Sequence, residues 1–275
     1  MCGVVGAIGY VDQPISYAIK KMNSQQNHRG PDGEGFWTST ANNAHGAVFA
    51  HRRLAIIDLS ENGRQPMVDS QTGNTITFNG EIYNYIKLKS ELEALGNTFH
   101  SESDTEVLLL AYRQWGNDFI NRIRGMFAIA IWAKSLRKVF CYRDRLGIKP
   151  FYYSVIGSGK KKTVLFSSEI KTLITSGLIE KKLNPEGVES FIWNGFVAGG
   201  ESTIALGVNL LEAGQQMTVD EAGNISEKRE YWVMPKHEPK DTISFQELEA
   251  TIEESVNIHL LSDAPLGVFL SGGID

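Results

Sequence analysis

The sequence has few cysteines, no long apolar run and no excess of basic charge. Its two cysteines, Cys2 and Cys141, form neither a CxxC pair nor a disulfide framework, which favours a reducing compartment. No apolar run reaches about 18 residues, and the N-terminus lacks a basic n-region followed by a small-residue cleavage site. We therefore expect a cytoplasmic protein without a membrane span.

The charge balance argues against further classes. The 275 residues carry a net charge of −5, and neither a basic face nor a polybasic tail is visible. A general nucleic-acid binder or a membrane-surface binder needs clustered positive charge, so we expect neither activity. The histidines show no spacing typical of metal ligands, and we predict no metal site.

The spacing of apolar residues divides the chain into three parts. Residues 2–232 contain many short strand-like runs and few strict β-α-β alternations, which favours an α+β sandwich over a doubly wound α/β fold. Residues 233–243 hold two prolines among charged side chains and are interpreted as a linker. Residues 244–275 show a helical pattern, a short apolar strand at 266–270 and a Gly-rich loop, like the opening of an α/β domain that is cut short.

Within the first part, periodicity and turn residues predict individual elements. Helices are expected at 14–26, 87–95, 104–115, 169–176 and 185–195. Strands are expected at 35–40, 46–57, 75–79, 126–133, 138–143, 151–156 and 164–167. Asp104 is expected to be the N-cap of its helix, since an acid directly before an apolar periodic run commonly caps a helix.

Cys2 directly follows the initiator methionine and precedes an apolar, Gly-punctuated strand at residues 3–9. If Met1 is removed, Cys2 carries both a thiol and a free α-amine, which together make a nucleophile and its own base. A carbonyl substrate attacked by this thiol would also need an oxyanion hole. The alternative is that Cys2 is a small structural residue, the commoner role of a single cysteine.

Three other stretches supply groups that such chemistry needs. Asn79 and Gly80 offer an amide and an unhindered backbone N–H for an oxyanion, although Asn-Gly between apolar residues more often marks a hairpin turn. Arg53 is suited to bidentate binding of a carboxylate, whereas its commoner role is a surface ion pair. An acid such as Asp104 could bind the ammonium group of an amino-acid substrate.

Taken together and in order, these stretches resemble class II glutamine amidotransferase domains, the N-terminal nucleophile hydrolase type. Within that group, the chain is most similar to glutamine-hydrolysing asparagine synthetases. The resemblance covers essentially the whole chain and rests on residues 2–3, 28–32, 51–58, 79–84, 103–106, 124–128, 143–150, 166–171 and 267–275.

The resemblance implies a four-layer αββα sandwich and a role for each matching residue. Cys2 would be the nucleophile, and Asn79 with Gly80 would form the oxyanion hole. Arg53 would bind the glutamine α-carboxylate, while Glu81 and Asp104 would face the α-ammonium group. The remaining matches are a pocket-lining strand with Leu54, Ile56 and Ile57, and a partial ATP-binding loop with Leu270, Ser271, Gly272, Gly273 and Asp275. The run Arg143–Pro150 is interpreted as structural, and Cys141 as a buried small hydrophobe.

The implied reaction is hydrolysis of L-glutamine to glutamate and ammonia, with no cofactor for this half. In the full-length enzyme, the ammonia would amidate aspartate at the expense of ATP with Mg, giving asparagine, AMP and diphosphate. A homodimer is possible. Three alternatives stay open: an acceptor that is a sugar acid or another carboxylate, an amidotransferase coupled to phosphoribosyl or sugar-phosphate chemistry, and a non-catalytic binding domain.

Overall fold

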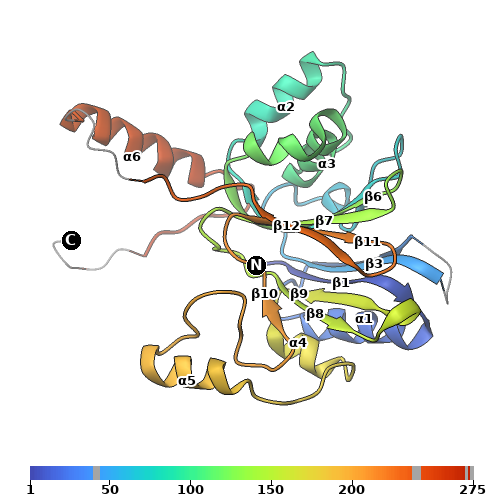
Figure 1. Cartoon of the computed structure of the whole chain (residues 1–275). Helices are drawn as coiled ribbons and strands as arrows, with labels where there is room; N and C mark the ends of the chain where they lie inside the picture. The colour runs from blue at the N-terminus through green and yellow to red at the C-terminus, as the bar shows by residue number, and fades with distance from the viewer. Residues whose placement is uncertain (40–43, 237–242, 270–271, 273–275) are drawn as a thin grey trace.

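The structure, a computed structural model, describes residues 1–39, 44–236, 243–269 and 272. Two β-sheets lie face to face, and a layer of helices covers the outer face of each sheet (Figure 1). One helical layer contains α1 (Gln13–Gln25) and α4 (Ile170–Thr175), and the other contains α2 (Tyr85–Ala94) and α3 (Asp104–Trp115). The predicted αββα sandwich is confirmed.

Each sheet has six strands, and all the pairings are antiparallel. The first sheet has the order β10 (Asn209–Leu210), β8 (Tyr152–Ile156), β9 (Thr163–Ser167), β1 (Gly3–Val11), β3 (Ala44–Arg53) and β2 (Gly33–Thr38). The second has the order β12 (Ile225–Glu230), β11 (Gln215–Asp220), β7 (Lys138–Arg143), β6 (Gly125–Ala133), β5 (Thr75–Ile82) and β4 (Met67–Val68). Short 3-10 helices lie at Glu61–Gly63, Gly116–Asn121 and Gly159–Lys161.

The central strands are apolar on both faces because each face packs against a different layer. On β6, Phe127 and Ile129 belong to the core beneath α2 and α3, whereas Ala128 and Trp132 belong to the core between the sheets. Successive side chains of a strand point to opposite faces, so burial of both faces requires a continuous apolar run. This two-sided burial explains why the sequence of β6 lacks a polar–apolar alternation.

Three details differ from the sequence-based expectations. The strand expected at 46–57 ends at Arg53, and residues 54–60 form a loop instead. Asn79 and Gly80 lie inside β5, so the hairpin-turn interpretation is wrong. The side chain of Ser103, not of Asp104, caps α3 by accepting a hydrogen bond from the Thr105 N–H, and Asp104 is the first residue of the helix. Asp104 is thus free to point elsewhere.

The C-terminal part projects from the sandwich as α6 (Phe245–His259) (Figure 1). A capping box between Ser244 and Glu247 fixes the start of this helix. Residues 266–269 of the expected strand do not form one, and within the described ranges no strand pairs with them. A strand needs a neighbour to satisfy its backbone, which explains this difference. The expected ATP-loop residues Leu270, Ser271, Gly273 and Asp275, and linker residues 237–242, lie outside the described ranges, whereas Gly272 is described and exposed.

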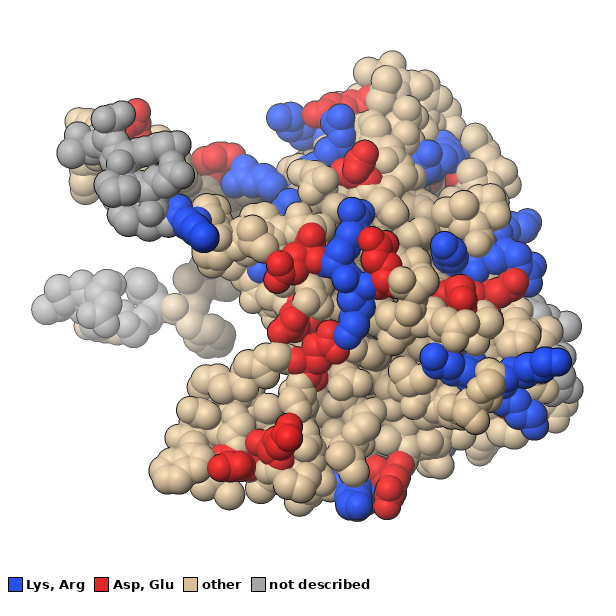
Figure 2. All heavy atoms as spheres, in the orientation of Figure 1, with Lys and Arg blue, Asp and Glu red and all other residues tan. Residues whose placement is uncertain are grey.

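The surface carries both signs of charge. On the face in Figure 2, Lys and Arg side chains are intermixed with Asp and Glu side chains over the described residues. Around α5 (Pro185–Asn194), exposed apolar side chains include Ile192 and Trp193. None of the described helices is both long and apolar enough to cross a membrane.

Candidate active site

Cys2 immediately precedes β1, one of the two central strands of the first sheet. The Arg29 Nε–H donates to the Cys2 carbonyl oxygen at 2.9 Å, which fixes the backbone of Cys2 from the side of α1. The Cys2 Sγ lies 3.4 Å from the Leu54 nitrogen and 3.6 Å from the Leu54 carbonyl oxygen. Burial raises the pKa of the thiol, although the Leu54 N–H opposes this effect. The thiol therefore needs a base before it can attack.

The chain terminus supplies an amine in the same cavity. The α-amine in the structure belongs to Met1, and burial lowers its pKa, with Arg29 and Lys149 lowering it further. A lowered pKa increases the neutral fraction of the amine at neutral pH, and only the neutral amine can accept a proton. Met1 lines the same cavity as Cys2, so its removal would leave the Cys2 amine at the thiol.

Strand β5 presents a row of N–H groups to this cavity. Phe127 uses its own N–H and carbonyl oxygen to bind Asp144, and Gly80, its register partner, therefore turns its N–H away from β6. On the same edge, the Phe78 N–H donates to Gln65 Oε1 at 2.6 Å, and the Ile82 N–H donates to Asp104 Oδ2 at 3.1 Å. The Gly80 N–H lies between them, and no side chain of the described residues accepts it.

The Asn79 side chain lies on the face of β5 that is turned toward the first sheet, whereas the Gly80 N–H lies in the plane of its own sheet. Asn79 is 1% exposed, and its Nδ2 has no hydrogen-bond partner among the described residues. A buried amide N–H without an acceptor lowers the stability of the fold by about 1–3 kcal/mol, and this donor is available to a bound ligand. The expected oxyanion hole thus consists of two unused donors, from adjacent residues of one strand, that line the cavity beside Cys2.

Arg53, the last residue of β3, binds the loop that follows it. Its guanidinium donates to the carbonyl oxygens of Ser60 at 2.6 Å and Ile57 at 3.3 Å, and makes a shorter contact with that of Asp58. A Cβ at Gly63 would lie 2.1 Å from Arg53 Nη2, so any larger residue there would push the guanidinium out of this position. Arg53 lines the cavity, but it also organises the pocket loop, a role that its sequence pattern did not predict.

Two acids line the far side of the cavity. Asp104 is 6% exposed, and burial raises its pKa to about 7, with the nearby Glu81 contributing in the same direction. Burial also raises the pKa of Glu81, which Lys149 opposes. Neither acid has an ion-pair partner among the described residues. An ammonium group placed between them would favour their ionised forms.

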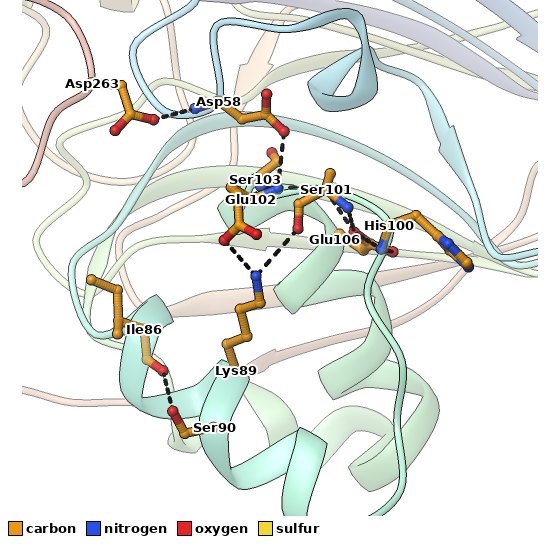
Figure 3. A network of polar contacts seen from close by, with 10 residues as sticks. All are labelled: Asp58, Ile86, Lys89, Ser90, His100, Ser101, Glu102, Ser103, Glu106 and Asp263. Carbon is orange, nitrogen blue, oxygen red and sulfur yellow. Dashed lines mark hydrogen bonds and ion pairs between the residues drawn. The ribbon is translucent and has the colours of Figure 1, made fainter.

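A polar network fixes the start of α3 and hence Asp104 (Figure 3). Glu106 accepts hydrogen bonds from the Ser101 N–H at 2.7 Å and the Ser101 hydroxyl at 2.6 Å. On the opposite side, Lys89 pairs with Glu102, with Nζ and Oε2 2.5 Å apart. Residues 101–106 are therefore held from both sides, directly around Asp104.

Lys149 is the functional candidate that the sequence reasoning missed. It belongs to the run Arg143–Pro150, interpreted above as structural, yet its side chain is 6% exposed and lines the cavity with Cys2. The carboxylate of Asp144 causes this placement, because it accepts the N–H groups of Ile148 and Lys149, each at 2.9 Å, and closes a tight turn. The Asp and Gly of this turn were visible in the sequence, but not the cavity that it reaches.

The structure brings every residue predicted for the glutamine site to one cavity. Their roles stay predictions, but their common location follows from the geometry. The cavity is lined by Met1, Cys2, Arg53, Leu54, Ile56, Ile57, Gly63, Gln65, Phe78, Asn79, Gly80, Glu81, Ser103, Asp104, Thr105 and Lys149. In the described ranges, no three His, Cys, Asp or Glu side chains gather where a metal ion could be held.

The Cys2 thiol beside the start of a central strand of an αββα sandwich, in one cavity with two unused N–H donors, is an arrangement typical of N-terminal nucleophile hydrolases. The family model for the glutamine amidotransferase domain matches residues 1–232, and the chain belongs to this family. A second family model, for asparagine synthase, matches residues 247–275.

Individual relatives agree with these matches. The chain is 39% identical over 283 residues to "Asparagine synthetase [glutamine-hydrolyzing] 1" of Bacillus subtilis, covering 100% of this chain and 42% of the relative. It is 37% identical over 295 residues to a putative asparagine synthetase [glutamine-hydrolyzing] 2 of Methanocaldococcus jannaschii, covering 100% and 55%. The chain thus spans about half the length of these relatives.

Among solved structures, glutamine phosphoribosylpyrophosphate amidotransferase from B. subtilis superimposes with a TM-score of 0.59. The match covers 85% of this chain and 50% of that chain, at 18% sequence identity. This likeness shows the shared fold.

Proposed function

We propose that this chain hydrolyses L-glutamine to glutamate and ammonia, with Cys2 as the nucleophile. The observation that carries the proposal is the cavity that the Cys2 thiol shares with the two unused donors of Asn79 and Gly80. The same cavity contains a guanidinium and two acids, the complement of an amino acid's carboxylate and ammonium groups.

The reaction divides into acylation and hydrolysis. After removal of Met1, the Cys2 α-amine takes the thiol proton, and the thiolate attacks the side-chain carbonyl carbon of glutamine. Asn79 Nδ2 and the Gly80 N–H donate to the resulting oxyanion, a contribution on the order of 10²–10³ in rate for one such donor. The C–N bond then breaks, the α-ammonium returns its proton to the leaving group, and ammonia departs. Water hydrolyses the γ-glutamyl thioester to glutamate and the free thiol.

Substrate recognition uses the remaining cavity residues. We place the α-ammonium group of glutamine between Glu81 and Asp104, and its α-carboxylate at Arg53. The backbone of Leu54, Ile56 and Ile57 lines the pocket, in a loop and not in the strand expected from the sequence.

The whole protein's activity is a further proposal, supported by the names of the relatives and by the asparagine synthase match at 247–275. In the full-length enzyme, ammonia would amidate aspartate with consumption of ATP, which would bind together with Mg, in the cytoplasm and as a homodimer. We divide the chain into a glutaminase domain at 2–232, a linker at 233–243 and the start of the synthetase domain at 244–275.

The decisive experiment compares the two cysteines. Glutamate release from glutamine should disappear in Cys2→Ala and persist in the matched control Cys141→Ala, because Cys141 is fully buried between the sheets. The intact mass of the active protein should lack Met1. Undiminished turnover in Cys2→Ala, or full activity with Met1 retained, would contradict the mechanism.

A further inference from the structure

We propose that Asp263 is a positioning residue for the glutamine pocket and that it fixes the pocket loop, residues 54–63, from outside the glutaminase domain. The inference rests on the proposed function, because the loop forms one wall of the cavity that contains Cys2. Asp263 lies in the segment after α6, within the asparagine synthase match.

Asp263 holds the loop by two hydrogen bonds to its backbone (Figure 3 shows the second). The Asp263 N–H donates to the Ile56 carbonyl oxygen at 2.9 Å, and the Asp263 carboxylate accepts the Asp58 N–H at 2.7 Å. The two bonds lie on either side of Ile57, which lines the cavity. A carboxylate acceptor makes the second bond charge-assisted and therefore stronger than a neutral one.

The loop requires such external support because its conformation is not one that the chain adopts readily. Asp58 has a φ of 55°, which is uncommon for a residue other than glycine. On the inner side, Arg53 binds loop carbonyl oxygens, and the Asp58 carboxylate accepts the Glu102 N–H at 3.0 Å. Asp263 supplies the outer support, because its carboxylate accepts the N–H of Asp58, the residue with the positive φ.

Among the described residues, the ion pair and ring contact between α6 and the sandwich do not involve this loop. Arg124 and Glu254 pair at 2.8 Å, but both side chains are more than half exposed, so the pair contributes little. The ring of His259 lies 3.9 Å from that of Tyr83. Asp263 therefore provides a direct route by which the position of the second segment affects the pocket loop. By thermodynamic reciprocity, bound glutamine should favour docking of this segment to the same extent.

The test compares three variants of the full chain. Asp263→Ala removes the acceptor and should raise the KM for glutamine about 3- to 10-fold with kcat nearly unchanged. Asp263→Asn keeps an acceptor oxygen and should restore a KM close to that of the parent protein. Ser262→Ala is the matched control, because among the described residues the Ser262 side chain bonds only its neighbour Ala264. An unchanged KM in Asp263→Ala, or equal effects of Ala and Asn, would overturn the proposal.

Hydrogen exchange provides a readout that does not depend on turnover. Peptides that cover residues 54–63 should exchange faster in Asp263→Ala than in Ser262→Ala, with the same thermal midpoint for both. If the parent protein showed no glutaminase activity, the proposed function would fail. Hydrogen exchange would still test whether Asp263 fixes the pocket loop. Equal exchange in the two variants would refute the role of Asp263 in fixing the pocket loop.

Discussion

The ionisable side chains near Cys2 have their charge states set by burial more than by a partner ion. Asp104 shows this most clearly, because its pKa is raised to about 7 and a substrate ammonium group would need the ionised form. Lys149 shows the opposite sign, because burial lowers the pKa of its ammonium group. Both lie in the cavity, so both should leave a signature in the pH dependence of turnover.

We expect the KM for glutamine to fall as pH rises from 6 to 8. The ionised fraction of a carboxyl group with a pKa about 7 rises roughly tenfold over this range, and only this form attracts the ammonium group. Asp104→Asn should have a high KM that no longer varies with pH, whereas the exposed Asp118→Asn should behave like the parent. Initial-rate kinetics at several pH values measure this, and an Asp104→Asn profile identical to the parent's would contradict the assignment.

Lys149→Met should shift the acid limb of the kcat/KM profile to higher pH. Removal of the cation ends its repulsion of the neighbouring α-ammonium group, so the amine base becomes neutral only at higher pH. At pH 7, we expect kcat/KM to fall on the order of tenfold, less than the ~10²–10⁴ lost with a complete acid–base group. Lys149→Arg keeps the charge and should keep the profile. A uniform loss of activity without a shift would indicate a purely structural role.

At the scale of elements, strand β5 depends on a side chain from another segment. Gln65 is 5% exposed, and it joins the Phe78 N–H to the Thr105 hydroxyl, that is, β5 to the start of α3. Gln65→Met keeps the volume but leaves the Phe78 N–H without an acceptor, which should lower the free energy of unfolding by about 1–3 kcal/mol. Urea denaturation measures this, with the exposed Gln71→Met as control. Equal midpoints would show that water replaces the glutamine.

The elements also show what a sequence pattern can and cannot predict. Apolar periodicity located the helices and the β6–β7 hairpin correctly, because these depend on neighbouring residues and on burial. The same kind of pattern predicted α6, yet its apolar residues remain exposed: Phe245 is 75% exposed and Ile252 is 55% exposed. Periodicity indicates an amphipathic helix, but not the surface that covers it.

The site was predictable where its chemistry lies in short motifs, as for Cys2 and the Asn79–Gly80 pair. Lys149 and Gln65 were not predictable, because only the folded chain carries them to the thiol. The pocket loop is intermediate: its residues were identified, but the strand expected there ends at Arg53. The cause is a guanidinium that binds three carbonyl oxygens of the loop, a long-range effect that β-propensity does not report.

At the scale of the whole molecule, His51 should make the sandwich sensitive to acid. It is fully buried on β3, its Nδ1 lies 3.2 Å from Thr77 Oγ1, and its pKa is lowered from about 6.5 to about 3. Between pH 6.5 and about pH 3, the His51 imidazole is protonated in the unfolded chain but neutral in the folded protein. Stability is therefore lost as pH falls through this window, by up to ~1.4 kcal/mol per pH unit from this group.

The variant His51→Gln should remove this contribution. Relative to the parent, its free energy of unfolding should increase step by step as pH falls from 6.5 to 4, while the exposed His100→Gln should follow the parent. Thermal or urea unfolding at several pH values provides the comparison. A constant difference between His51→Gln and the parent across this range would show that burial of the imidazole is not what costs stability in acid.

The position of Met1 on the wall of the cavity has a practical consequence for anyone who produces or labels this protein. An affinity tag fused ahead of Met1 would keep the α-amine of Cys2 in a peptide bond, so this amine could not act as the base proposed above. Chemical labels are better attached at the exposed turn Gly159–Lys161, whose lysines point to solvent on another part of the sandwich. The choice of an N-terminal tag therefore decides whether the purified protein can be active.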